Sequence, residues 1–128
     1  MRSIDRYLRW LPAGLMMAAI FVFSSIPSKE MPNFGLWDLL VKKGGHMTGY
    51  ALLAIFIWFA LRWDRRWLWL TFFLTVLYAG SDEFHQSFVR GRHASLVDVG
   101  IDSIGALIAL CIAFFVRKRK EPLAPPTG

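Results

Sequence analysis

Four apolar stretches alternate with short polar segments along the chain. They cover residues 11–26, 46–61, 67–80 and 96–116, and the first has an alternative start at Leu8. A membrane-spanning helix takes roughly 20 apolar residues, so a chain of 128 residues has room for about four short ones and no separate soluble domain. The pattern therefore predicts an all-α integral membrane protein, a small bundle of about four transmembrane helices in one domain over residues 1–120.

The composition agrees with this interpretation. Hydrophobic residues make up 55% of the chain and aromatic residues 16%, and the mean hydropathy is +0.42, which is too apolar for a small soluble domain. The last segment, residues 121–128, is rich in proline and is predicted to be a disordered tail.

The basic residues sit in three short clusters at the ends of the apolar stretches. These clusters are the N-terminus, residues 62–66 and residues 117–120. By the positive-inside rule they mark the cytoplasmic side, with both termini in the cytoplasm. Their positions also make nucleic acid an improbable partner for a chain of net charge +6. The polar segments 42–50 and 81–102 are then expected at the opposite, extracytoplasmic face.

The first apolar stretch has two interpretations. A basic start followed by an apolar core is also typical of a cleaved signal peptide. We favour a retained helix because three further apolar stretches follow, and because Trp10 suits an interfacial anchor. The segment from Pro27 to Val41 is expected to be an irregular or interfacial loop, and Ser24 and Ser25 are expected to cap the helix end.

Polar side chains in the second, third and fourth stretches recur at helical spacing. Charged groups at a membrane edge usually mark function, since an Asp at the bilayer centre costs roughly 3 kcal/mol on insertion scales. Gly105 and Ala109 form a small-residue stripe that would let a neighbouring helix approach closely and bring these groups together. Residues four apart share a helix face, which pairs His46 with Tyr50, Asp82 with Gln86, and Asp98 with Asp102.

Three kinds of chemistry fit these residues. In acid–base or phosphate-directed catalysis, Arg92 and Arg90 would clamp a phosphate while Glu83 or His46 moves a proton. A divalent metal site is a weaker alternative, because the HExxH spacing is absent. The third alternative is a non-catalytic binder or transporter, and a purely structural charge network also remains open.

The pattern as a whole resembles a known family. Lys43-x-x-His46-x-x-x-Tyr50 is followed by Asp82-Glu83-x-x-Gln86-x-Phe88-x-x-Gly91-Arg92, and then by Ser95-x-x-Asp98 with Gly105 further on. Over about residues 24–110 this series is similar to the VanZ-like membrane proteins. The resemblance implies a bacterial multi-helix membrane protein, in a family named for members that lower susceptibility to the glycopeptide teicoplanin. Two departures are Asp102, where the family usually has Asn, and Arg90, where proline is common.

We therefore expect a site at the extracytoplasmic face of the bacterial cytoplasmic membrane. Its partner would be a membrane lipid or a lipid-linked envelope precursor, without a cofactor and without nucleic acid, and the chain would form a homodimer through the Gly105 stripe. The candidate catalytic residues are His46, Asp82, Glu83 and Asp98. The candidate binding residues are Lys43, Tyr50, Gln86, Arg90, Arg92 and Asp102.

Overall fold

The structure is a computed structural model, and it describes residues 2–27, 35–91 and 95–120. Most of these residues are helical, and no strand occurs among them, which confirms the all-α class. Short 3-10 turns, η2 (Gly35–Trp37) and η3 (Arg65–Trp67), precede two of the helices. The α-helices are α1 (Arg2–Leu8), α2 (Leu11–Ser25), α3 (Asp38–Ala60), α4 (Leu68–Gln86) and α5 (Leu96–Lys120).

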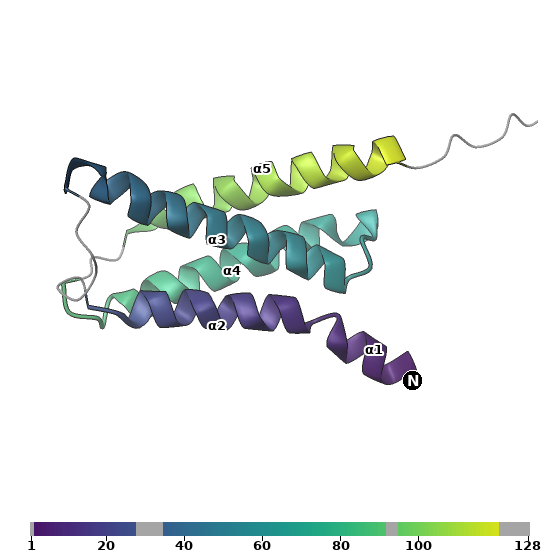
Figure 1. Ribbon diagram of the computed structural model, residues 1–128, viewed down its shortest axis with the longest axis horizontal. Helices are drawn as coiled ribbons and strands as arrows, with labels where there is room; N and C mark the ends of the chain where they lie inside the picture. Colours follow the sequence, from purple (N-terminus) through teal and green to yellow (C-terminus); the bar gives the residue numbers. More distant parts are fainter. Residues whose placement is uncertain (1, 28–34, 92–94, 121–128) are drawn as a thin grey trace, which may run out of the picture.

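Helices α2 to α5 lie side by side and alternate in direction (Figure 1). The most extensive contact joins α3 to α5, and α4 and α2 complete the bundle. Because the directions alternate, the start of α2, the turn between α3 and α4, and the end of α5 share one end of the bundle. The end of α4 and the start of α5 lie at the opposite end, which is where the polar positions gather.

The helices are longer than the apolar stretches predict. Helix α3 begins at Asp38, so residues 38–41 are helical and the expected loop over 27–41 is wrong for that part; residues 28–34 lie outside the described structure. Helix α4 continues past the predicted end at Gly80 to Gln86, and α5 continues through the basic residues to Lys120. Polar side chains end an apolar stretch without ending a helix, since the backbone can still pair internally.

Two helical segments are long and apolar enough to cross a membrane, Ser3–Ser25 and Leu96–Lys120. Only 17% and 22% of their apolar windows are buried, unlike the mostly buried core helix of a soluble protein. Helices α3 and α4 do not pass this test, since Lys43 and His46 in α3 and Asp82 and Glu83 in α4 lower their hydropathy. The two exposed apolar helices indicate a membrane protein.

A close approach between α3 and α5 is made at Gly105. A Cβ atom added there would lie 2.5 Å from Met47 Cγ and 2.9 Å from the Met47 carbonyl oxygen. The predicted close helix packing at Gly105 is therefore confirmed. Its partner is a helix of the same chain, so a homodimer contact at this stripe would have to displace Met47.

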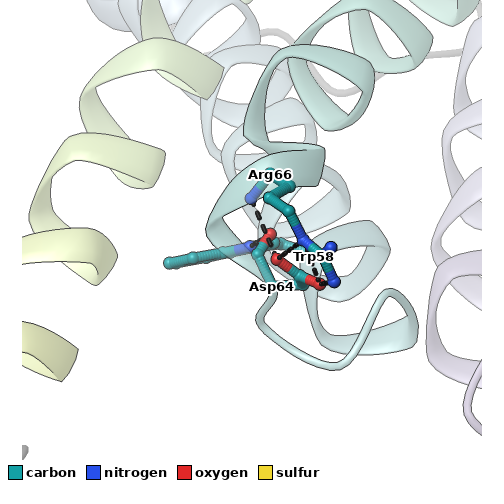
Figure 2. Close-up of polar contacts among 3 residues, drawn as sticks. All are labelled: Trp58, Asp64 and Arg66. Atoms are coloured by element: carbon teal, nitrogen blue, oxygen red, sulfur yellow. Dashed lines mark hydrogen bonds and ion pairs between the residues drawn. The ribbon is translucent and has the colours of Figure 1, made fainter.

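The turn between α3 and α4 is held by Asp64 (Figure 2). The Asp64 carboxylate accepts hydrogen bonds from the Arg66 guanidinium at 2.8 Å and from the Arg66 backbone N–H at 3.0 Å, while its carbonyl accepts from Trp58 Nε1 at 3.0 Å. The bonds from Arg66 lower the pKa of Asp64 below its usual 3.8. Arg62 and Trp63 adopt positive φ angles of 62° and 59°, which lets the chain reverse.

Cations from all three basic clusters contact aromatic residues or helix ends at this end of the bundle. Arg117 lies 4.4 Å from the ring centre of Trp63, and Arg9 donates a hydrogen bond to the Phe59 carbonyl at 3.2 Å. Arg65 lies 5.1 Å from the ring centre of Phe114. The three basic clusters of the sequence thus meet in space.

Candidate functional site

Asp82 is the centre of a buried hydrogen-bond cluster between α2, α3 and α4. Its Oδ2 atom accepts hydrogen bonds from Ser24 Oγ at 2.8 Å, the Tyr50 hydroxyl at 2.9 Å and Gln86 Nε2 at 3.1 Å. Each of the four side chains is 5% exposed or less. The Asp82 cluster, defined as these four residues, therefore ties three helices together.

The structure brings Tyr50, Asp82 and Gln86 together, as their helical spacing suggests. Ser24 was not among the predicted site residues. It was expected to cap the end of α2, but its hydroxyl instead donates to Asp82 and accepts from Gln86 Nε2 at 3.2 Å. A serine at the end of an apolar stretch gives no pattern that names a partner 58 residues away, so the sequence alone could not have identified it.

Lys43 and Asp98 form an ion pair between α3 and α5. Lys43 Nζ lies 2.6 Å from Asp98 Oδ1, and the two side chains are 41% and 27% exposed. The pair therefore sits at the rim of the polar region, with access from outside the bundle. Its formation brings together one predicted binding residue and one predicted catalytic residue from stretches that are 55 positions apart.

Glu83 lies beside the start of α5. Its Oε2 atom accepts a hydrogen bond from the backbone N–H of Ser95 at 3.0 Å, and the residue is 6% exposed. A carboxylate at this position also faces the partial positive charge of a helix N-terminus. Glu83 thus helps to position α5 against α4.

Asp102 lies one helical turn further into the bundle than Asp98 and is 3% exposed. Its carboxylate is within electrostatic range of Glu83, Asp98, Asp82 and Lys43. Three of these four neighbours carry carboxyl groups.

We call Lys43, Glu83, Asp98 and Asp102 the lysine–carboxylate cluster. Lys43 attracts all three carboxylates, most strongly Asp98. The set has an excess of negative charge when all its groups are ionised, and Asp82 lies close by. Ionised carboxylates that are close together in a low-dielectric site repel one another. The cluster therefore favours the binding of a cation or a proton over that of an anion.

The remaining predicted residues are more dispersed. The His46 ring stacks on Tyr50 with centroids 6.4 Å apart, which places it next to the Asp82 cluster. Arg90 is exposed in the turn after α4. Arg92 lies outside the described residues, so the predicted guanidinium clamp for phosphate is not tested. The ring of His85 stacks on that of Phe21 in α2, with centroids 4.5 Å apart.

A divalent metal site finds no support in the part of the chain that the structure describes. Within residues 2–27, 35–91 and 95–120, no three His, Cys, Asp or Glu side chains are placed to hold a metal ion. Cys111 is a free thiol on α5. The polar residues that do meet are arranged for hydrogen bonding and for ion pairing.

The chain was compared with known families, with curated proteins and with solved structures. A model of the VanZ/LLP1 family matches residues 8–117, a range that includes α2 to α4, most of α5 and every residue of the two clusters. No curated protein and no solved structure is found to match. The family match covers most of the chain and confirms the resemblance of its motifs. The chain belongs to the VanZ/LLP1 family.

Proposed function

We propose that this VanZ/LLP1 family member spans the bacterial cytoplasmic membrane four times and carries its lysine–carboxylate cluster at the extracytoplasmic face. There it recognises the headgroup of a membrane lipid or of a lipid-linked envelope precursor. This recognition lowers susceptibility to a glycopeptide such as teicoplanin. Both termini lie in the cytoplasm.

Helix lengths support four spans. At 1.5 Å per residue, the 23 residues of α3 extend about 35 Å and the 19 residues of α4 about 28 Å, close to the hydrocarbon thickness of about 30 Å. Both helices pack beside the two segments that are apolar enough to span. Their polar residues face one another, as in membrane proteins whose charged groups line an internal site.

The orientation is supported by the basic end of the bundle. Arg9, Arg65 and Arg117 gather there around aromatic side chains. The positive-inside rule assigns such an end to the cytoplasm. The lysine–carboxylate cluster lies at the other end, and its partly exposed Lys43–Asp98 pair would open toward the outside of the cell.

The observation that carries the proposal is the convergence of Lys43, Glu83, Asp98 and Asp102 from three helices. This arrangement favours recognition over turnover. Asp82, a candidate catalytic residue, already accepts three hydrogen bonds on one oxygen. Incubation of the purified protein with a lipid-linked precursor, at varied pH and with added divalent metal, tests this choice. Unchanged precursor supports recognition, whereas a new product would establish turnover.

The function itself is tested by antibiotic susceptibility. A sensitive bacterium expresses the wild-type chain, Glu83→Gln, or the control Asp5→Asn, whose carboxylate is exposed on α1. All three are compared at matched membrane levels. We expect wild type and Asp5→Asn to protect against teicoplanin more than against vancomycin, and Glu83→Gln to lose this protection. Equal protection by all three would remove the cluster from the function.

A further inference from the structure

We propose that the junction of α1 and α2 binds one anionic phospholipid. Its acyl chain would lie in an apolar groove along the junction, and its phosphate would be bound by Arg9 and Arg117. The site is at the basic end of the bundle, opposite the lysine–carboxylate cluster. The inference therefore goes beyond the proposed function and does not depend on it.

The junction forms because a regular helix is broken at Pro12. Proline has no backbone N–H, so the Leu8 carbonyl receives no hydrogen bond from the fourth residue along the chain. Helix α1 ends at Leu8, the Trp10 N–H donates to the Tyr7 carbonyl at 3.0 Å, and α2 then begins at Leu11. The two helices meet at an angle, and α1 extends away from the rest of the bundle (Figure 1).

An open groove of about 450 Å³ lies along this junction. Ligand pockets have volumes of about 300–1,000 Å³, so it is large enough for part of a lipid. Gly14 leaves room in the groove, since a Cβ atom added there would meet no atom within 4 Å. The lining is apolar and comes from both helices and the residues between them: Ile4, Tyr7, Leu8, Trp10, Leu11 and Gly14.

The lining residues are exposed, although they belong to a segment, Ser3–Ser25, that is apolar enough to cross a membrane. Ile4, Tyr7 and Leu8 are each more than half exposed and share one face of α1, at spacings of three and four residues. Arg6 and Arg9 lie outside this apolar face. Amphipathic helices of this kind lie at the boundary between headgroups and acyl chains. An acyl chain is therefore the occupant that fits the groove.

Two guanidinium groups favour an anionic headgroup. Arg9, which lies between Leu8 and Trp10 in the chain, stacks over Phe59 at 4.6 Å, and Arg117 stacks over Trp63 at 4.4 Å. The two rings contact each other with centroids 5.8 Å apart, which brings both ends of the chain together. No residue in the described part of the chain accepts a hydrogen bond from the Arg117 guanidinium, so its donors remain for a phosphate.

The net charge of the headgroup should decide the preference among lipids. Guanidinium groups bind phosphate through paired hydrogen bonds. A zwitterionic headgroup also carries an ammonium group, which the neighbouring arginines would repel. The site should therefore prefer phosphatidylglycerol to phosphatidylcholine.

The experiment uses the full chain in phosphatidylcholine nanodiscs that contain increasing amounts of a phosphatidylglycerol with a diazirine in its acyl chain. Illumination attaches the reactive chain to the protein, and mass spectrometry of peptides locates the attachment. We expect saturable labelling within residues 4–14. Unlabelled phosphatidylglycerol should compete, whereas added phosphatidylcholine and soluble glycerol phosphate should not.

Two pairs of variants test the groove and the headgroup contact separately. Gly14→Leu fills the groove and should remove most of the labelling, whereas Gly80→Leu, where an added Cβ also meets no atom within 4 Å, should label like wild type. Arg117→Gln should raise the half-saturating amount of lipid about fivefold. Arg119→Gln removes the same charge from the opposite side of α5 and should have little effect. Circular dichroism checks that all four variants are folded.

Several results would overturn the inference. These are labelling that does not saturate, equal competition by phosphatidylcholine, and labelling of Gly14→Leu at the wild-type level. Equal weakening by Arg117→Gln and Arg119→Gln would show only a diffuse attraction between basic residues and anionic lipid. A second copy of the chain is the other possible occupant of the groove. Disulfide-linked dimers through Gly14→Cys, in a Cys111→Ala background, would identify it and overturn the lipid site.

Discussion

Lys43 Nζ lies 2.6 Å from Asp98 Oδ1 and joins α3 to α5 at the polar end of the bundle. Because both side chains are partly exposed, we expect the pair to contribute little to stability. Its larger effect should be on recognition. Lys43→Met and Asp98→Asn should each abolish teicoplanin protection while shifting the apparent melting temperature only slightly.

The exchanged pair, Lys43→Asp with Asp98→Lys, is the matched control for that prediction. It keeps one cation and one carboxylate but reverses their places. Protection should stay lost, because a bound headgroup depends on where each charge lies. Full protection by the exchanged chain would show that the pair serves only to hold α3 against α5.

Tyr50→Phe is expected to destabilise the bundle. It removes one of three donors to the carboxyl group of Asp82, in a buried cluster where a lost hydrogen-bond partner costs about 1–3 kcal/mol. Tyr78→Phe is the control, since its hydroxyl donates at 2.6 Å to the neutral carbonyl of Met17, where the loss should be about 0.5–1.5 kcal/mol. Unfolding of both variants in the same detergent gives the comparison. Equal losses would contradict the central place of Asp82 in the fold.

Gly105→Ala is expected to separate α3 from α5. The added Cβ would overlap Met47, whose backbone oxygen cannot move aside as a side chain can, and such overpacking costs about 1–3 kcal/mol. Gly100→Ala, on the same helix, has no atom within 4 Å of the added Cβ and should be neutral or stabilising by up to about 1 kcal/mol. Apparent melting temperatures of the two variants should therefore change in opposite directions or by clearly different amounts.

Asp64, in the turn at the basic end of the bundle, is expected to make the stability of the protein depend on pH. Hydrogen bonds from Arg66 hold its pKa below the usual 3.8, so its stabilising contribution is present above that value and is lost as the pH falls through the lowered pKa. Asp64→Asn should be less stable than wild type at pH 7. The difference should shrink below about pH 4 and vanish at more acidic pH, as thermal unfolding of the two chains can measure. A difference that is independent of pH would contradict this account.

Helical spacing was enough to predict several contacts of the site. The four-residue steps from Asp82 to Gln86 and from Asp98 to Asp102 placed each pair on one helix face, and Gly105 indicated a close helix contact. All three features appear in the bundle. The spacing of residues along one helix determines which of them share a face, so this feature can be predicted from a short stretch of sequence.

Partners across helices could not be predicted in the same way. Ser24 meets Asp82 only because α2 packs beside α4, and Gly105 meets Met47 because the chain folds back on itself. The predicted helix ends were also wrong. The apolar stretch ends at Gly80, but α4 continues to Gln86. Hydropathy reports the surroundings of side chains, whereas backbone hydrogen bonds decide where a helix ends.

The central claim is that the lysine–carboxylate cluster faces the outside of the cell. The most direct measurement is labelling with a membrane-impermeant maleimide in intact spheroplasts, in a Cys111→Ala background. Ser87→Cys reports the polar end and Lys118→Cys the basic end, and both positions are exposed. We expect Ser87→Cys to label in intact spheroplasts and Lys118→Cys to label only after lysis. Labelling of Lys118→Cys in intact spheroplasts, with Ser87→Cys protected until lysis, would contradict the claim.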